Sequence, residues 1–305
     1  MMVLCLVGEQ PIPNLLPVRF LKPQETLLVH TNLQASQQSA RRLAGLIENA
    51  RLFSIGDGYR IPGIVEKLRQ AVGKQDEVVI NLTGGTKPMA LAAFELARQR
   101  RFPVVYYQTE GPRGRDQKSL IYLYRFTDEG ELCLESEYPQ SVPPLITLDD
   151  YLKAHLDNYQ VKGPSQDSGG ELERAIARVL GEYVDESLQG VVPGGVKDQA
   201  EIDLLIRCGN HVGVLEIKTG GSGSGKKAVD QLTTIAAREY LGTYAARFLV
   251  TQTSMEDRYK PLAQALRVTV IELREYRPGR DLSQNDKVRL LQGIAQSIPI
   301  RQEGV

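Results

Sequence analysis

Short apolar runs alternate with amphipathic stretches along the first part of the chain. The β-rich runs are Val3–Val7, Thr26–His30, Val78–Asn81 and Val104–Thr109. Apolar residues at helical spacing lie between these runs, near Gln34–Ile47, Pro62–Val72 and Pro88–Arg100. Because strands and helices alternate, the pattern predicts an α/β domain in which helices cover both faces of a parallel sheet. Ligands of such sheets bind at the carboxyl ends of the strands.

The segment 201–218 has the pattern of a β-hairpin. Gly209-Asn210 is the Gly-first pair that suits a two-residue type II′ turn. With this turn, Cys208 pairs with His211 across the hairpin. The register of every other residue in the two strands then follows by counting outward from the turn.

In this register three charged side chains share one face of the hairpin. Asp203 lies opposite Glu216, and Lys218 lies on the same face two residues further on. Two carboxylates with Cβ atoms roughly 5 Å apart destabilise a sheet. A divalent cation between them turns that repulsion into a hard oxygen-ligand site. The opposite face is wholly apolar and holds Ile202, Leu204, Ile206, Leu215 and Ile217.

This arrangement of two carboxylates and an ammonium suits phosphodiester hydrolysis. A metal held by two carboxylates can activate water and neutralise charge on the substrate, while the ammonium orients the nucleophile or stabilises the transition state. The alternative is an ordinary strand pair whose Glu and Lys face solvent. In that alternative Glu201, which lies opposite Lys218 in the same register, forms a plain cross-strand ion pair with it.

The pattern resembles the PD-(D/E)xK nuclease superfamily. Asp203, Glu216 and Lys218 match its metal-binding and catalytic positions, and the backbone of Ile217 adds a metal ligand. Such nucleases often add an acidic residue from a preceding helix; here 170–180 offers Glu171 and Glu173, of which Glu173 fits the usual Gly-x-x-Glu spacing. The resemblance implies a restriction-endonuclease-like α/β domain that cleaves DNA or RNA with Mg²⁺ or Mn²⁺.

Length and charge predict how the chain is organised. At 305 residues it is long enough for two domains, each with its own core. Residues 1–126 hold 17 Lys and Arg against 10 Asp and Glu, so this domain suits an anionic ligand. Residues 127–168 hold 2 Lys and Arg against 9 Asp and Glu and are rich in proline, which indicates a connector. Residues 169–305 hold 18 basic and 18 acidic residues, and we expect them to form the second domain.

Several classes of protein are disfavoured. The cysteines at 5, 133 and 208 are scattered and odd in number, which argues against a disulfide scaffold or a zinc site and favours a reducing cytosol. No apolar run approaches the roughly 18 residues that a membrane helix requires. Met1–Val7 lacks a basic region before it and reads as a strand, not a signal peptide. We therefore expect a cytoplasmic protein with no membrane partner.

Two loops of the first domain have unusual sequences. Residues 8–14 follow the first strand, and Asn81–Met89 runs from a strand into a helix whose first turn accommodates Pro88. Gly84 and Gly85 let backbone N–H groups approach an anion at the helix N-terminus, while Thr83, Thr86 and Lys87 supply hydroxyls and a charge. Alone, such a Gly-Gly loop is equally consistent with a tight turn.

Both loops resemble those of the CARF domain, the CRISPR-associated Rossmann-fold sensor. The matching motifs are Gln-Pro-x-Pro-Asn at 10–14 and Asn-x-Thr-Gly-Gly-Thr-Lys-x-Met at 81–89. The resemblance implies a Rossmann-like sheet that binds cyclic oligoadenylate, here cyclic tetra-adenylate, across a homodimer interface in type III CRISPR defence. The ligand-binding positions that it implies are Gln10, Pro11, Asn14, Thr83, Gly84, Gly85, Thr86 and Lys87.

Joined to the Glu-x-Lys domain, this resemblance predicts a nuclease switched on by a cyclic adenylate. A second interpretation is a constitutive DNA nuclease of the junction-resolving or restriction kind, and a third is a regulator with an inactive nuclease fold. The two loops argue against the second interpretation. The intact triad of Asp203, Glu216 and Lys218 argues against the third.

The segment after the hairpin imitates a nucleotide-binding loop. Gly220–Lys227 fits Gly-x4-Gly-Lys, but Lys227 stands where magnesium binding needs Ser or Thr. Its two lysines could instead contact nucleic-acid phosphates, and a mobile surface loop without such a role is an equal alternative. A helix is expected over Ala228–Leu241, with Gln231 near the metal site.

Overall fold

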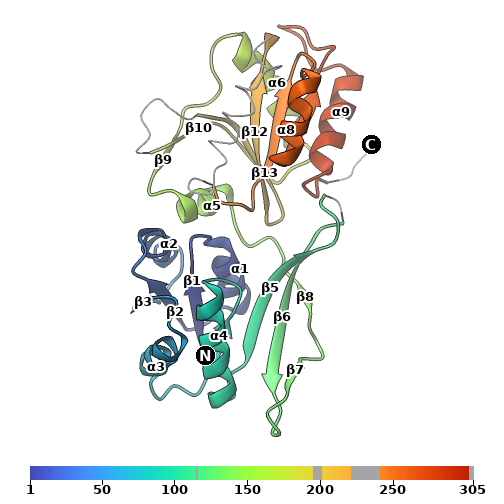
Figure 1. The fold of residues 1–305 in the computed structure, drawn as a ribbon. Coiled ribbons are helices and arrows are strands. Elements are labelled where there is room, and N and C mark those ends of the chain that lie inside the picture. Colours follow the sequence, from blue (N-terminus) through green and yellow to red (C-terminus); the bar gives the residue numbers. More distant parts are fainter. Residues whose placement is uncertain (115, 195–200, 221–240, 302–305) are drawn as a thin grey trace. The chain divides into compact units, whose positions relative to one another are not determined.

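The computed structural model describes residues 1–114, 116–194, 201–220 and 241–301. By its internal contacts the chain divides into two compact units (Figure 1). The first comprises Met1–Glu110, Lys118–Leu145 and Lys153–His155; the second comprises Gly111–Gln117, Ile146–Leu152 and Leu156–Val305. The expected helix over Ala228–Leu241, with Gln231 and the two lysines before it, falls largely outside the described residues. No helix in the described ranges has both the length and the apolar character that crossing a membrane requires.

The first unit is built on a sheet in the order β3-β2-β1-β4-β5-β6-β7, with β8 paired to β6. Five strands are parallel, namely β1 (Met2–Val7), β2 (Glu25–Thr31), β3 (Ala50–Gly56), β4 (Val78–Asn81) and β5 (Val104–Glu110). The antiparallel strands are β6 (Lys118–Phe126), β7 (Leu132–Leu134) and β8 (Gln140–Ser141). The strand order reverses between β1 and β4, and ligands of Rossmann-like sheets bind at such a reversal.

Helices cover both faces of this sheet, as the sequence predicts. Met2, Leu4 and Leu6 of β1 pack into one core cluster with residues of α3 (Ile61–Val72) and α4 (Lys87–Arg100). The alternate residues of β1 are also fully buried and point to the other face. The helices α1 (Ile12–Leu21) and α2 (Gln34–Ala44) contact the strand as well and cover that face.

The first unit differs from the sequence prediction in three places. Helix α1 begins at Ile12, inside the stretch 8–14 that we expected to be a loop, because Pro13 fits the first helical turn. Strand β3 was not predicted, because its residues are mostly exposed or half-buried and show no apolar alternation. The antiparallel strands β6 to β8 also extend the sheet beyond the purely parallel one that was expected.

The second unit holds a six-stranded sheet in the order β14-β13-β12-β11-β10-β9. The antiparallel strands are β9 (Tyr159–Val161), β10 (Glu186–Pro193), β11 (Ile202–Cys208) and β12 (His211–Lys218). Strands β13 (Ala246–Thr251) and β14 (Val268–Glu272) continue parallel to β12. The stretch 127–168, expected to be a connector, therefore supplies strands to both sheets. In the sequence, α5 (Leu148–His155) lies between these strands.

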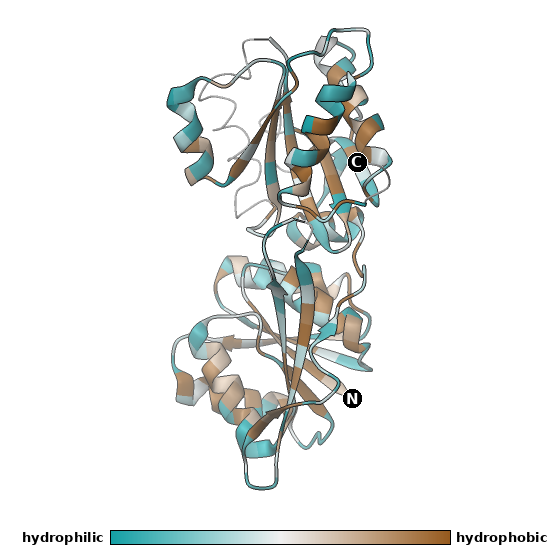
Figure 2. Cartoon of the chain, turned by 90° about the vertical axis from the view of Figure 1, so that its right-hand side faces the viewer, coloured by the Kyte–Doolittle hydropathy of each residue, from teal (hydrophilic) through white to brown (hydrophobic). Residues whose placement is uncertain are grey.

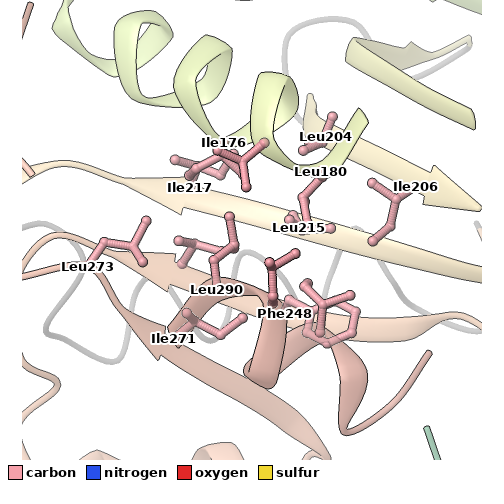
Figure 3. Close-up of a cluster of buried hydrophobic side chains, with 14 of the residues drawn as sticks. Ile176, Leu180, Leu204, Ile206, Leu215, Ile217, Phe248, Ile271, Leu273 and Leu290 are labelled. Atoms are coloured by element: carbon pink, nitrogen blue, oxygen red, sulfur yellow. The ribbon is translucent and has the colours of Figure 1, made fainter. Parts of the chain in front are cut away.

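The core of the second unit lies between its sheet and two helices, α6 (Ser168–Gly181) and α9 (Gln284–Ala295). In Figure 3, Ile176 and Leu180 of α6 point at Leu204, Leu215 and Ile217 of the hairpin. The remaining helical elements are η2 (Asp257–Tyr259) and α8 (Lys260–Ala265). Figure 2 shows strands that are largely apolar and helices that carry polar segments, as amphipathic covering helices do.

Candidate functional site

Strands β11 and β12 form the hairpin that the sequence predicts. Cys208 pairs with His211, and the pairing runs to Leu204 and Leu215. Gly209 has a φ of +61°, as the first central residue of a type II′ turn requires. Continuing the register by one residue sets Asp203 opposite Glu216, as predicted. The residues at 204, 206, 215 and 217 all join the apolar core.

Three charged side chains of the hairpin lie together. The ammonium of Lys218 forms an ion pair with Glu216, and its Nζ lies 4.0 Å from Oδ2 of Asp203. The side chain of Glu216 is 1% exposed, against 14% for Asp203 and 21% for Lys218. Lys218 therefore pairs with the two carboxylates of its own face. Glu201, its partner in the alternative interpretation, is exposed at the start of the strand.

Asp203 also interrupts the backbone pairing of the hairpin. Beyond Leu204 and Leu215 the Ile217 N–H donates to Oδ2 of Asp203, with 2.6 Å between nitrogen and oxygen. The N–H and C=O of one strand residue point to the same neighbouring strand. The carbonyl of Ile217 is consequently directed to the side on which Asp203 lies.

Helix α6 brings one of its two candidate carboxylates to this site. Glu173 is 8% exposed, and the charge of Asp203 contributes to raising its pKa. Glu171 has a different task, because its Oε2 accepts a hydrogen bond from the Gly279 N–H at 2.9 Å. The helix periodicity explains the difference, since residues two apart on a helix face different directions.

The electrostatics of the site show an excess of negative charge. Burial, reinforced by the charge of Asp203, raises the pKa of both Glu216 and Glu173 to about 7. Burial also raises the pKa of Asp203, although the charge of Lys218 opposes this. For Lys218 burial lowers the pKa, but the charges of Glu216 and Asp203 outweigh that effect and raise it overall. Lys218 thus remains an ammonium among several carboxylates.

The donor set fits a hard divalent cation. Both oxygens of Glu216 are buried, and the ammonium of Lys218 pairs with Oε1. Two largely buried carboxylates that share one ammonium retain negative charge, which a divalent cation would compensate. Within the described ranges no group of three or more His, Cys, Asp or Glu side chains is arranged to hold a metal. The available ligands are therefore the carboxylates of Asp203 and Glu216 and the carbonyl of Ile217, completed by water.

The two loops of the first unit meet at the reversal point between β1 and β4. Asn81, at the end of β4, is fully buried, and its Nδ2 donates to Oδ1 of Asn14 and to the carbonyl of Pro13, both at 3.1 Å. Its Oδ1 accepts hydrogen bonds from the N–H of Thr83 at 3.0 Å and from the hydroxyl of Thr83 at 2.7 Å. Asn14 in turn donates to the carbonyl of Leu6 at 3.0 Å. These amides fix both loops to the strand ends.

The glycine pair makes a close approach to β1 possible. A Cβ at Gly84 would lie 2.2 Å from the carbonyl oxygen of Leu6, and Gly85 has a φ of +75°. Thr86 caps helix α4 by accepting from the Met89 N–H at 3.3 Å, and its hydroxyl donates to the carbonyl of Gly58 at 3.0 Å. Lys87 follows as an exposed residue.

The structure thus separates the predicted ligand-binding residues by exposure. Pro11 and Asn14 are buried, and Gln10, Thr83, Gly84 and Thr86 are half-buried, whereas Gly85 and Lys87 are exposed at the helix N-terminus. Residues 57–60 were missed as part of this site, because strand β3 before them was not predicted. The glycine at 58, a residue that often marks a close backbone approach, was the available signal.

Comparisons with known proteins agree with this architecture. Residues 2–128 match the family model of the Card1 CARF domain. Can2 from Sulfobacillus thermosulfidooxidans, solved in complex with cyclic tetra-adenylate, is 14% identical with a TM-score of 0.73, over 96% of this chain and 99% of Can2. VC1899 from Vibrio cholerae is 16% identical with a TM-score of 0.67, over 97% and 98% of the two chains.

A type III CRISPR defence DNA nuclease activated by cyclic oligoadenylate has the same fold in part. It is 15% identical with a TM-score of 0.53, and the match covers 94% of this chain but 44% of that nuclease. No curated protein sequence matches the chain. At these identities the solved structures show a shared fold, which extends over both units.

Proposed function

We propose that this chain is a metal-dependent endonuclease of type III CRISPR defence that a cyclic oligoadenylate activates. The observation that carries the nuclease assignment is the cluster of Asp203, Glu216 and Lys218, in which two carboxylates, one of them only 1% exposed, share a single ammonium. The second unit is then a restriction-endonuclease-like domain of the PD-(D/E)xK kind. Its substrate is the phosphodiester backbone of DNA or RNA.

Each residue of the site has a role that follows from its position. Asp203, Glu216 and the carbonyl of Ile217 would hold Mg²⁺ or Mn²⁺, and Glu173 adds a further carboxylate beside them. When bound, the ion supplies charge neutralisation at the phosphodiester. Lys218, held by its two carboxylate partners, presents a fixed positive charge to the negative charge that develops during hydrolysis.

The first unit is proposed to be the sensor. Its support is the match of residues 2–128 to the Card1 CARF domain and the common fold with Can2, which was solved with cyclic tetra-adenylate. The exposed Lys87 and the backbone N–H groups at the start of α4 offer positive potential to an anionic ring. A ring of repeated adenylates is best met by two copies of one loop set, so we also propose a homodimer formed through the first units.

The decisive experiment measures cleavage of labelled single-stranded DNA, duplex DNA and RNA with Mg²⁺ or Mn²⁺, with and without cyclic tetra-adenylate and cyclic hexa-adenylate. We expect cleavage that requires both the metal and one of the rings. Cleavage that is equally fast without any ring would favour the constitutive nuclease instead. Absence of cleavage under every condition, with ring binding intact, would leave a sensor and remove the nuclease assignment.

A further inference from the structure

A cavity of about 320 Å³ in the second unit is lined by three arginines. Arg174 and Arg178 lie on one face of helix α6, one turn apart, and Arg280 lies on the segment after β14. Tyr276 also lines it. A guanidinium carries five donors in a fixed fork that matches phosphate oxygens, so three of them around one cavity suit a phosphate ligand.

The segment that presents Arg280 is held as a tight turn. The Arg280 N–H donates to the carbonyl of Arg277 at 3.2 Å, and Gly279 has a φ of +75°. Pro278 before this glycine completes the signature of a type II turn. Because Glu171 of α6 accepts from the Gly279 N–H at 2.9 Å, the turn is fixed against the helix that carries the other two arginines.

The two carboxylates that line the cavity are already engaged. Glu171 binds the turn, and Asp281 forms an exposed ion pair with Arg178. Arg174 uses one donor on the carbonyl of Ser165 at 2.8 Å. The exposed guanidinium of Arg280 forms no hydrogen bond or ion pair with any described residue. Arg174 and Arg280 therefore retain donors for a ligand.

The cavity is linked to the carboxylate site through the backbone. Arg174 directly follows Glu173 on α6, but consecutive helix residues face different directions, and the cavity lies on the face that carries Glu171. The Gln252 N–H donates to the carbonyl of Lys218 at 3.2 Å, and Nε2 of Gln252 donates to the carbonyl of Tyr276 at 3.1 Å. One glutamine thus joins the strand of the candidate catalytic lysine to the wall of the arginine cavity.

We propose that Arg174 and Arg280, supported by Arg178, bind a backbone phosphate of the nucleic-acid substrate away from the bond to be cleaved. This inference rests on the proposed nuclease function and adds to it a positioning site outside the metal-binding residues. The contacts are to phosphate and carry no base information, so binding here is independent of sequence. DNA and RNA share this chemistry.

The test uses the full chain with Glu216→Gln added, so that bound nucleic acid stays intact. Fluorescence anisotropy measures binding of labelled single-stranded DNA, its duplex and RNA of the same sequence, with cyclic tetra-adenylate present, over a series of salt concentrations. Arg280→Ala and Arg174→Ala are each expected to weaken binding about tenfold. Each should also lower the slope of log affinity against log salt by about 1. The probes that respond identify the substrate class.

Three controls make the result specific. Arg258→Ala removes an exposed arginine that does not line the cavity, and it should leave affinity and slope unchanged. Arg280→Lys keeps the charge and should restore the slope, while the loss of the guanidinium fork keeps part of the affinity defect. In chains with intact Glu216, Arg280→Ala should raise KM and leave kcat near the wild-type value.

The outcomes separate this inference from the proposed function. In one outcome the Glu216→Gln chain binds nucleic acid and the chain with intact Glu216 cleaves it, but adding Arg174→Ala, Arg280→Ala or both to the Glu216→Gln chain changes neither the affinity nor the salt slope. The arginine site is then wrong and the nuclease proposal stands. If the Glu216→Gln chain binds none of the three nucleic-acid probes, the nuclease proposal fails and the arginine site fails with it. Circular dichroism of each variant confirms that a defect is not misfolding.

Discussion

The side-chain amide of Asn81 donates to the carbonyl of Pro13, 3.1 Å away, which is the carbonyl that Pro17 leaves without its helical partner. In an α-helix the N–H of residue 17 would bond this oxygen, and proline has none. The last residue of β4 therefore completes the hydrogen bonding of α1. This single contact explains how two prolines, which usually indicate a loop, are accommodated in a helix.

Replacing Asn81 with alanine should destabilise the first unit by about 2–4 kcal/mol, because it removes the partners of the buried Pro13 carbonyl and of the half-buried Thr83 N–H. Urea denaturation monitored by circular dichroism measures the loss. Asn32→Ala, at an exposed position after β2, is the matched control and should change stability by less than about 0.5 kcal/mol. Equal effects of the two substitutions would contradict this account of Asn81.

Gly84→Ala should loosen the loop before α4, because the added Cβ would lie 2.2 Å from the carbonyl oxygen of Leu6. We expect weaker binding of cyclic tetra-adenylate by calorimetry and a lower melting temperature. Gly63→Ala places a methyl where no atom lies within 4 Å, and in a helix alanine gains about 0.5–1 kcal/mol over glycine. If Gly84→Ala changed neither ring binding nor the melting temperature, the close approach of the residue 84 backbone to β1 would not be needed.

Lys87→Ala should weaken binding of cyclic tetra-adenylate about ten- to a hundredfold, because it deletes a charge-assisted contact worth about 1.5–3 kcal/mol. Saturating ring should restore much of the cleavage rate, since the substitution leaves the second unit unchanged. Lys74→Ala, another exposed lysine of the first unit, is the control. Normal ring binding combined with lost cleavage would mean that the loop is not the sensor.

Glu216→Gln should abolish cleavage and at the same time stabilise the metal-free protein. The glutamine keeps the shape of the side chain and removes a carboxylate whose pKa burial and Asp203 raise even though Lys218 pairs with it, so the melting temperature in EDTA at neutral pH should rise. Ring binding should be unaffected. Near-normal, metal-dependent cleavage by this variant would show that Glu216 is not part of the catalytic site. Glu171→Gln, which makes the same change at another glutamate and keeps Glu216 intact, serves as the control.

The carboxylate of Asp185 should make stability depend on pH. Burial alone would raise its pKa, but the hydrogen bond from Gly209 and the charges of Arg207 and Arg301 lower it overall. A lowered folded-state pKa means that the stabilisation is complete above the ordinary value of 3.8 and is lost as the pH falls through the folded value. Asp185→Asn should therefore cost about 1–3 kcal/mol at pH 7.

In strong acid the two chains should converge, because the wild-type carboxyl is then protonated as well. Urea titrations of both chains at several pH values measure the difference. Asp257→Asn removes an exposed ion pair with Lys260 and should have little effect at any pH. A difference that stays constant down to acid pH would assign the role of Asp185 to its shape and not to its charge.

The hairpin could be predicted from the sequence because its constraints are local. A two-residue turn fixes the register, and the register fixes which side chains oppose each other, so the meeting of Asp203 with Glu216 follows without knowledge of the rest of the fold. Four of the five parallel strands of the first unit, all except β3, were found for a related reason, since each begins as a buried apolar run. The choice of Glu173 over Glu171 came from motif spacing.

The missed elements depend on distant partners. Helix α1 is stabilised by Asn81, which lies far along the chain, and no local pattern around Pro13 and Pro17 reveals that hydrogen bond. Strand β3 lies at the sheet edge, where exposed residues leave no apolar alternation to read. The arginine cavity likewise joins α6 to a turn about a hundred residues later in the sequence.

Strand β12 is the place where the second sheet changes from antiparallel to parallel pairing, with β11 on one side and β13 on the other. Glu216 and Lys218 are carried by a strand that is paired with β13 through Lys218 and with β11 as far as Leu215, beyond which the Ile217 N–H bonds the side chain of Asp203. Such a strand cannot shift its side chains without breaking hydrogen bonds on both edges. We therefore expect the triad to exist ready-made in the resting protein, so that an activator governs whether nucleic acid can reach it and not whether it forms.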